Sequence, residues 1–187
     1  MITVEFTAEE MKHISNIGEA RTDMNKYNRD IADYDQRRFK LTSLQANKLG
    51  VMVEAALVKY FGYDILTVSM ENWVSFYTAA EAHNYKSSPD VFHNGQWYDT
   101  RRVEKRSNPV AMRTKDRNQN VVVVQGFVDY ILTDGKVKPG RKVELHGWAE
   151  PAKDWEDGWK PGWAKTNDSR VIDPKPIEEL FGEKVAA

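Results

Sequence analysis

Residues 89–101 read PDVFHNGQWYDTR, and this stretch decides how the centre of the chain folds. Asn94 and Gly95 lie between β-prone residues, and both can adopt the positive φ that a two-residue type I′ hairpin turn requires. That turn places Asp90 directly opposite Asp99. Opposed side chains on antiparallel strands have β-carbons roughly 4.5–5.5 Å apart, where two carboxylates repel each other. The pattern therefore predicts a hairpin that holds a cation between its aspartates.

Three charged side chains share one face of this predicted hairpin. Because side chains alternate along a strand, Arg101 lies on the face of Asp99, and Asp90 joins them from across the turn. Carboxylates without histidine or cysteine suit Mg²⁺ or Mn²⁺ rather than zinc. Such an ion can orient a water molecule and stabilise charge on a phosphate. The sequence leaves open a second interpretation, a surface hairpin whose aspartates are solvated or paired with Arg101 and Arg102.

The composition narrows the class of protein. The chain has 187 residues, of which 41% are hydrophobic, so it can form one domain with a substantial core, or one domain with a helical extension. The absence of cysteine excludes a disulfide scaffold and a cysteine nucleophile, and it fits a reducing cytosol. No apolar run approaches the roughly 20 residues of a membrane span. We expect a cytoplasmic protein with no membrane partner.

The order of predicted elements indicates an α/β or α+β fold, a mixed central sheet flanked by helices. Four consecutive valines at residues 121–124 are typical of a strand buried on both faces. The expected elements are a helix from about residue 8, a helix over residues 42–62 that is apolar on two sides, a strand over 64–70, a helix from 71 or 72 to 83, the hairpin over about 88–103, a strand pair within 120–150 and a short helix within 176–182.

The pattern of residues 89–101 resembles the PD-(D/E)XK nuclease superfamily. Its elements are "PD", eight intervening residues and "DTR", with Arg101 where the motif has lysine. Residues 48–62 look like the helix that precedes the core in many members, and Glu54 matches the glutamate that completes their metal site. Residues 98–155 are similar to phage-borne members, in which the motif strand leads into two more strands and a "GW" segment. The resemblance spans roughly residues 45–165.

The resemblance implies a restriction-endonuclease-like fold and a metal-dependent deoxyribonuclease, phage-encoded and acting in the host cytoplasm. The core would occupy residues 43–187, with a Trp-rich C-terminal segment, after a helical extension over residues 1–42. The implied cofactor is Mg²⁺ or Mn²⁺, and the implied substrate is DNA rather than RNA. The implied catalytic residues are Glu54, Asp90, Asp99 and Arg101, and the implied metal ligands are Glu54, Asp90, Asp99 and the carbonyl of Thr100.

Two features of these residues bear on activity. Glu54 falls between the two apolar stripes of its predicted helix, where a lone carboxylate requires a cation unless it is partly exposed to water. Arg101 stays protonated, so it can grip a phosphate but cannot act as a base. Lys105 cannot replace it, because six strand residues of about 3.3 Å each put it roughly 20 Å from Asp99. Either the metal alone activates water, or the site is weak or inactive.

Basic residues follow the aspartate pair. Residues 101–117 contain seven Lys/Arg and two acids, although the whole chain has a net charge of −1. The segment is either a solvated loop or a surface that tracks the nucleic-acid backbone. The candidate nucleic-acid-binding residues are Arg102, Lys105, Arg106, Arg113, Lys115 and Arg117.

A second hypothesis is a catalytically weak or inactive nuclease-fold protein that binds nucleic acid or inhibits a host protein. It is motivated by Arg101 and by four tryptophans within residues 148–163. Exposed aromatic rings can stack on unpaired bases or form a protein-binding surface, whereas buried rings would fix a loop-rich segment over the sheet. A third hypothesis concerns the first 40 residues, whose thin apolar stripe suits a helical arm for homo-oligomerisation.

Overall fold

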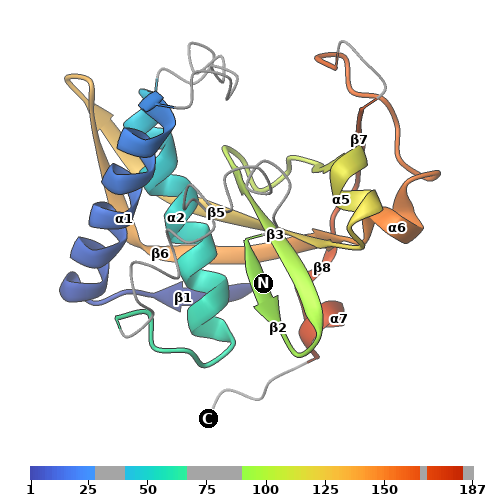
Figure 1. The fold of residues 1–187 in the computed structure, drawn as a ribbon, viewed down its shortest axis with the longest axis horizontal. Helices are drawn as coiled ribbons and strands as arrows, with labels where there is room; N and C mark the ends of the chain where they lie inside the picture. The colour runs from blue at the N-terminus through green and yellow to red at the C-terminus, as the bar shows by residue number, and fades with distance from the viewer. Residues whose placement is uncertain (28–40, 67–89, 165–167, 183–187) are drawn as a thin grey trace. The chain divides into compact units, whose positions relative to one another are not determined.

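The computed structural model describes residues 1–27, 41–66, 90–164 and 168–182 (Figure 1). It is a mixed α+β fold. The chain divides into two compact units, and we describe each by itself. The first comprises Met1–Val4, Pro89–Phe127 and Glu144–Ala187, and the second comprises Glu5–Ser88 and Val128–Val143.

The main sheet contains both parallel and antiparallel pairs. Its strand order is β1-β6-β5-β3-β2, with β8 also paired to β6. Strand β3 runs parallel to β5 and antiparallel to β2, and β4 and β7 form a separate antiparallel pair. The strands are β1 (Ile2–Glu5), β2 (Val91–His93), β3 (Gln96–Val103), β4 (Val110–Arg113), β5 (Val122–Thr133), β6 (Lys136–Ala149), β7 (Ser169–Ile172) and β8 (Lys175–Pro176).

The predicted hairpin register is confirmed. Phe92 pairs with Trp97 across β2 and β3, which makes Asn94-Gly95 a two-residue turn. The φ angles of Asn94 and Gly95 are 48° and 81°, as a type I′ turn requires. The β2–β3 hairpin therefore brings Asp90 and Asp99 to opposing positions.

The valine run forms the centre of the first unit. All four valines of residues 121–124 are buried, which confirms a strand covered on both faces. Val123 lies beside Asp99 in the parallel β3–β5 pair. It also belongs to a core cluster with Val110, Met112, Ala149 and Trp155. The strand that carries Asp99 is thus held against the most buried strand of the unit.

Two helices make up much of the second unit, α1 (Ala8–Tyr27) and α2 (Ser43–Tyr60). Thr7 and Glu10 exchange hydrogen bonds at the start of α1, as the capping box predicts. The helices pack closely at Gly18, where an added Cβ would lie 2.9 Å from the Cα of Lys48. Residues 51–58 of α2 are all buried, which confirms the expectation of a mostly buried helix.

Other predicted elements have mixed outcomes. The late helix is confirmed as α7 (Ile177–Phe181), and the strand pair within residues 120–150 is confirmed as β5 and β6. Residues 64–66 are not in a strand, because residues 65 and 66 form a turn and residue 64 directly precedes it. The rest of the strand predicted over 64–70, and the helix predicted to end at residue 83, lie outside the described residues. The boundary predicted between residues 42 and 43 stays a prediction. The elements that the sequence did not indicate are β1, β4, β7, β8, α5 (Thr114–Asn118) and α6 (Pro151–Asp154).

Gly95 tests the turn that sets the hairpin register. We expect Gly95→Ala to lower the free energy of unfolding by about 1 kcal/mol, because a side chain is disfavoured at positive φ. Gly162→Ala is the matched control, since both glycines have open space at the Cβ position but Gly162 lacks a positive φ. Urea denaturation measures both variants. Equal effects of the two substitutions would contradict the assignment of the turn.

Candidate functional site

The β2–β3 hairpin and α5 bring together a network of charged side chains in the first unit. Asp90 accepts two hydrogen bonds through Oδ2, from the backbone nitrogen of Thr100 at 2.7 Å and from its hydroxyl at 2.8 Å. Asp99 is buried, with 4% of its surface exposed, and forms an ion pair with Nη2 of Arg101. The aspartates predicted to face each other are therefore both engaged by protein donors of strand β3.

Arg101 is the centre of this network. Its Nη2 also contacts both carboxylate oxygens of Asp116 on α5, at 3.1 and 3.2 Å, and its Nη1 donates to the carbonyl of Thr100 at 3.1 Å. Asp116 is 1% exposed, and it accepts a further hydrogen bond from the backbone nitrogen of Arg113 at 2.8 Å. One guanidinium thus joins β3 to the helix that follows β4.

The pKa shifts in this network follow from burial and from the shared cation. Burial by itself would raise the pKa of Asp99, but the charge and hydrogen bond of Arg101 outweigh it and hold that pKa below its usual value. Burial raises the pKa of Asp116, with Arg101 opposing the shift and Asp99 adding to it. Burial disfavours the Arg101 cation, yet Asp99 and Asp116 raise its pKa above the ordinary value. Arg101 is therefore a permanent cation here. The positive charge of Lys115 also lowers the pKa of both aspartates.

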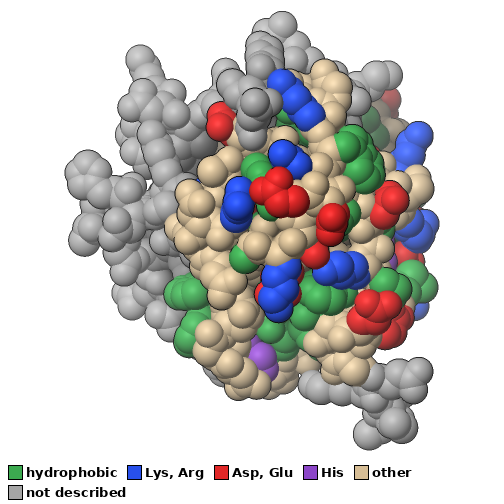
Figure 2. All heavy atoms as spheres, turned by 90° about the vertical axis from the view of Figure 1, so that its right-hand side faces the viewer, with side chains coloured by type: hydrophobic (Ala, Val, Ile, Leu, Met, Phe, Trp, Pro, Cys, Tyr) green, Lys and Arg blue, Asp and Glu red, His purple; other side chains and the backbone are tan. Residues whose placement is uncertain are grey.

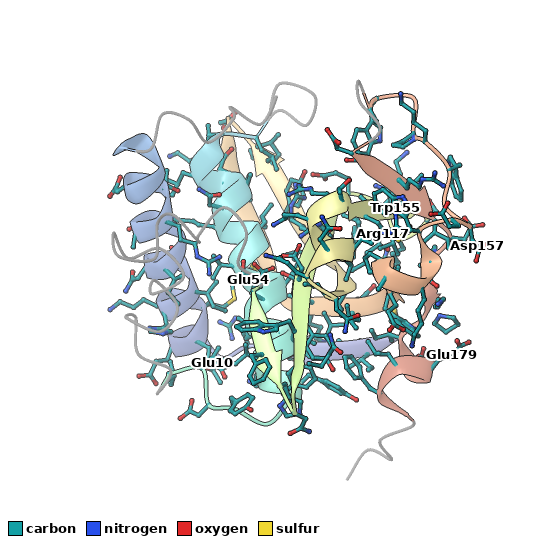
Figure 3. All side chains as sticks on the ribbon, turned by 45° about the vertical axis from the view of Figure 1, so that its right-hand side comes forward. Glu10, Glu54, Arg117, Trp155, Asp157 and Glu179 are labelled. Atoms are coloured by element: carbon teal, nitrogen blue, oxygen red, sulfur yellow. The ribbon has the colours of Figure 1, made fainter. Side chains whose placement is uncertain are left out.

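Glu54 lies in the second unit, on α2, and already has a cation (Figure 3). Arg21 of α1 donates to both of its carboxylate oxygens, at 2.5 and 2.6 Å. The two residues are 5% and 7% exposed, so the pair is buried. The cation that a lone carboxylate at this position requires is thus supplied by the protein. Arg21 was not predicted as the partner, although a glutamate between two apolar stripes is the signal that a partner must exist.

The expected metal ligands do not fit a divalent cation as they are arranged here. Each of the four oxygen donors named from the resemblance receives a hydrogen bond or an ion pair from the protein: Glu54 from Arg21, Asp90 from Thr100, Asp99 from Arg101, and the Thr100 carbonyl from Arg101. Over the described parts of the chain, no three His, Asp or Glu side chains form a group that could hold a metal ion. Asp116, which the sequence did not single out, takes part in this arrangement as the second acid on Arg101.

The basic segment of residues 101–117 is largely matched by acids of the first unit. Arg102 pairs with Glu104 at 2.6 Å, and Arg117 pairs with Glu156 at 3.5 Å. Arg106 binds both oxygens of Glu144 and lies 4.1 Å from the ring centroid of Phe127. The Arg106 hydrogen bond holds the pKa of Glu144 below its usual range. Lys105 is exposed. Figure 2 shows basic and acidic side chains interspersed on one face of the molecule.

The tryptophans divide between the two roles considered for them. Trp155 is buried, and the guanidinium groups of Arg117 and Arg170 each lie 5.6 Å from its ring centroid (Figure 3). Trp148 donates its indole N–H to the carbonyl of Pro176 at 3.0 Å, so it fixes the C-terminal segment. Trp159 and Trp163 are 47% and 54% exposed. Two of the four rings are therefore available at the surface.

Comparisons with protein-family models, with curated proteins and with solved structures find no match to this chain. Among the helices that the structure describes, none has the length and apolar character needed to cross a membrane.

Arg101 tests the internal charge network. We expect Arg101→Gln to lower the free energy of unfolding by about 3–5 kcal/mol at pH 7, because it leaves two buried carboxylates without their cation. Arg117→Gln is the control, since its ion pair is largely exposed and contributes about 1 kcal/mol or less.

The pH dependence of this loss follows from the carboxylates. In the wild type, Asp99 has a lowered pKa, so its stabilisation is present above the unfolded-state pKa and is lost as the pH falls through the folded-state pKa. In Arg101→Gln, burial without the cation raises the carboxylate pKa, and protonation relieves the penalty as the pH falls. The difference between variant and wild type should therefore narrow from pH 7 to pH 4 in urea denaturation. A constant difference would contradict the assigned ion pairs.

Proposed function

We propose that this chain is a nuclease-related DNA-binding protein with a restriction-endonuclease-like fold, in which Arg101 takes the place of the metal ion. The observation that carries the proposal is the position of the Arg101 guanidinium on Asp99 and Asp116. In the superfamily that residues 89–101 resemble, the position of Asp99 holds a metal ligand and the position of Arg101 holds a lysine. Here Asp99 and Arg101 form an ion pair with each other.

The energetics favour the internal cation over a bound one. A Mg²⁺ ion at Asp99 would have to displace the guanidinium, and breaking a buried ion pair typically costs about 3–5 kcal/mol. Asp90 would also lose its two bonds from Thr100. Arg101 cannot then accept a proton from water, because its pKa is far above any working pH. The arrangement therefore suits binding without hydrolysis.

Nucleic acid is the proposed partner because residues 45–165 resemble enzymes that act on it, and because Lys105 stays exposed within the basic segment. A host protein is the other partner considered, since Trp159 and Trp163 present exposed rings. The proposed location, the host cytoplasm of a phage-encoded protein, rests on the same resemblance.

A second candidate function is Mg²⁺-dependent hydrolysis of DNA. The opposition of Asp90 and Asp99 across the turn favours it, and Asp116 adds a third carboxylate, on the guanidinium that Asp99 also contacts. If Arg101 turned to a substrate phosphate, these carboxylates would be left to hold the ion. Arg101 would then bind the phosphate rather than neutralise the site.

Manganese binding separates the two functions. We expect calorimetry to detect no Mn²⁺ binding to the wild type, and we expect its binding to DNA to persist in EDTA. Arg101→Ala frees Asp99 and Asp116 and should raise the affinity for Mn²⁺ by at least about tenfold, which corresponds to roughly 1.4 kcal/mol. Arg102→Ala is the matched control, because Arg102 pairs only with Glu104 among the ion pairs of β3 described here.

The wild-type measurements decide the question even if Arg101→Ala does not fold. Cleavage of single- or double-stranded DNA by the wild type, dependent on Mn²⁺ and lost in Asp99→Ala, would replace the first proposal with the second. Failure to bind DNA at low salt, together with capture of a protein partner, would exclude nucleic acid as the partner of this protein.

A further inference from the structure

The β5–β6 hairpin ends in an exposed two-stranded arm, which we define as residues 129–142. Residues 131–136 are all exposed, and only residues 130, 137 and 139 of the arm are partly covered. Its tip is a two-residue turn at Asp134-Gly135, with φ angles of 50° and 70°. Gln45 of α2 donates to the carbonyl of Gly135 at 2.7 Å, so the tip is held against the helix within the second unit (Figure 1).

One face of the arm carries a row of lysines. Side chains alternate along β6, and Lys136, Lys138 and Lys142 share the exposed face, whereas Val137 and Val143 lie on the covered one. Arg141 adds a fourth exposed cation on the other face. The lysines span roughly 20 Å, at about 3.3 Å per strand residue.

Strand β5 contributes few charges to this face. The two-residue turn places Thr133 opposite Lys136, Ile131 opposite Lys138 and Asp129 opposite Gly140. The last pairing agrees with the position of Gly140, whose added Cβ would lie 3.3 Å from the Asp129 carbonyl. Within residues 129–142 this face thus has three lysines and one acid and no aromatic ring, and Phe127 is the next residue of β5 with the same side-chain orientation.

The cations of the arm lack the internal acids that engage the 101–117 segment. In the described parts of the chain, no ion pair involves Lys136, Lys138 or Arg141. Lys142 pairs with Glu5 at 3.6 Å, but both side chains are more than 60% exposed, so this pair contributes little. Their charge is therefore available to an external anion.

We propose that the arm binds the phosphate backbone of duplex DNA through Lys136, Lys138 and Lys142, an inference that rests on the proposed function. A two-stranded β-ribbon fits the major groove, which is about 12 Å wide. A linear row of cations matches a linear row of phosphates. Recognition of single strands relies on stacking with several aromatic rings, and residues 129–142 place none on this face. The arm gives the protein a contact with DNA that is separate from the network around Arg101.

The salt dependence of binding tests the arm in the full chain. The variant Lys136→Ser/Lys138→Ser is compared with Lys153→Ser/Lys160→Ser, which removes the same charge from exposed lysines elsewhere. Fluorescence anisotropy with a 20-base-pair duplex is measured over a series of salt concentrations. Losing two phosphate contacts should reduce the slope of log K against log[salt] by about 1.8. The control pair should leave the slope unchanged.

The outcomes separate this inference from the proposed function. If the wild type binds the duplex and the arm variant keeps the wild-type slope and affinity, the arm does not contact DNA, while the proposed function stands. If the wild type binds no DNA at low salt, both fail. Binding to vesicles containing phosphatidylserine in preference to the duplex, lost in the arm variant, would assign the arm to a membrane surface instead. Thermal unfolding of both variants is measured as well, to check that each retains the fold.

Discussion

The guanidinium of Arg101 joins two carboxylates, one from its own strand and one from helix α5. Asp99 comes from the same strand, Asp116 comes from a helix fifteen residues later, and the Thr100 carbonyl completes the contacts. A buried carboxylate requires a compensating charge, and two of them next to each other require it more. The position of α5 on β3 therefore depends on this one cation, and so does the protonation of the acids around it.

The same principle governs the charges elsewhere in the described chain. Glu54 is neutralised by Arg21 within the helical unit, and Glu144 is neutralised by Arg106 within the other. Four of the seven cations of residues 101–117 thus pair with acids of the first unit, and Glu144 and Glu156 come from outside the segment. The arm at the end of β5 and β6 is the exception, since no ion pair of the described residues involves Lys136 or Lys138, and Lys142 has only an exposed pair with Glu5.

Local signals predicted the hairpin well. Asn94-Gly95 favours one turn type, and the turn sets the register over the next few residues without help from the rest of the chain. The buried valine strand and the capping box at the start of α1 were predictable for the same reason. The short elements β4, α5 and β7 were not, because strands of four residues depend on a partner about sixty residues away, and a five-residue helix carries too little periodicity to detect.

The candidate site was predictable only in part, because some of its contacts are local and others form only when distant elements pack together. The sequence by itself predicted that Asp90, Asp99 and Arg101 share one face of a hairpin, since strand alternation and turn geometry act locally. Only the tertiary structure decided which cation serves those aspartates. Asp116 reaches Arg101 of β3 only once α5 has packed against α6 and β4, and Arg21 meets Glu54 because α1 packs on α2. Whether a carboxylate binds a metal or an arginine depends on which groups surround it after folding, and spacing along one strand does not contain that information.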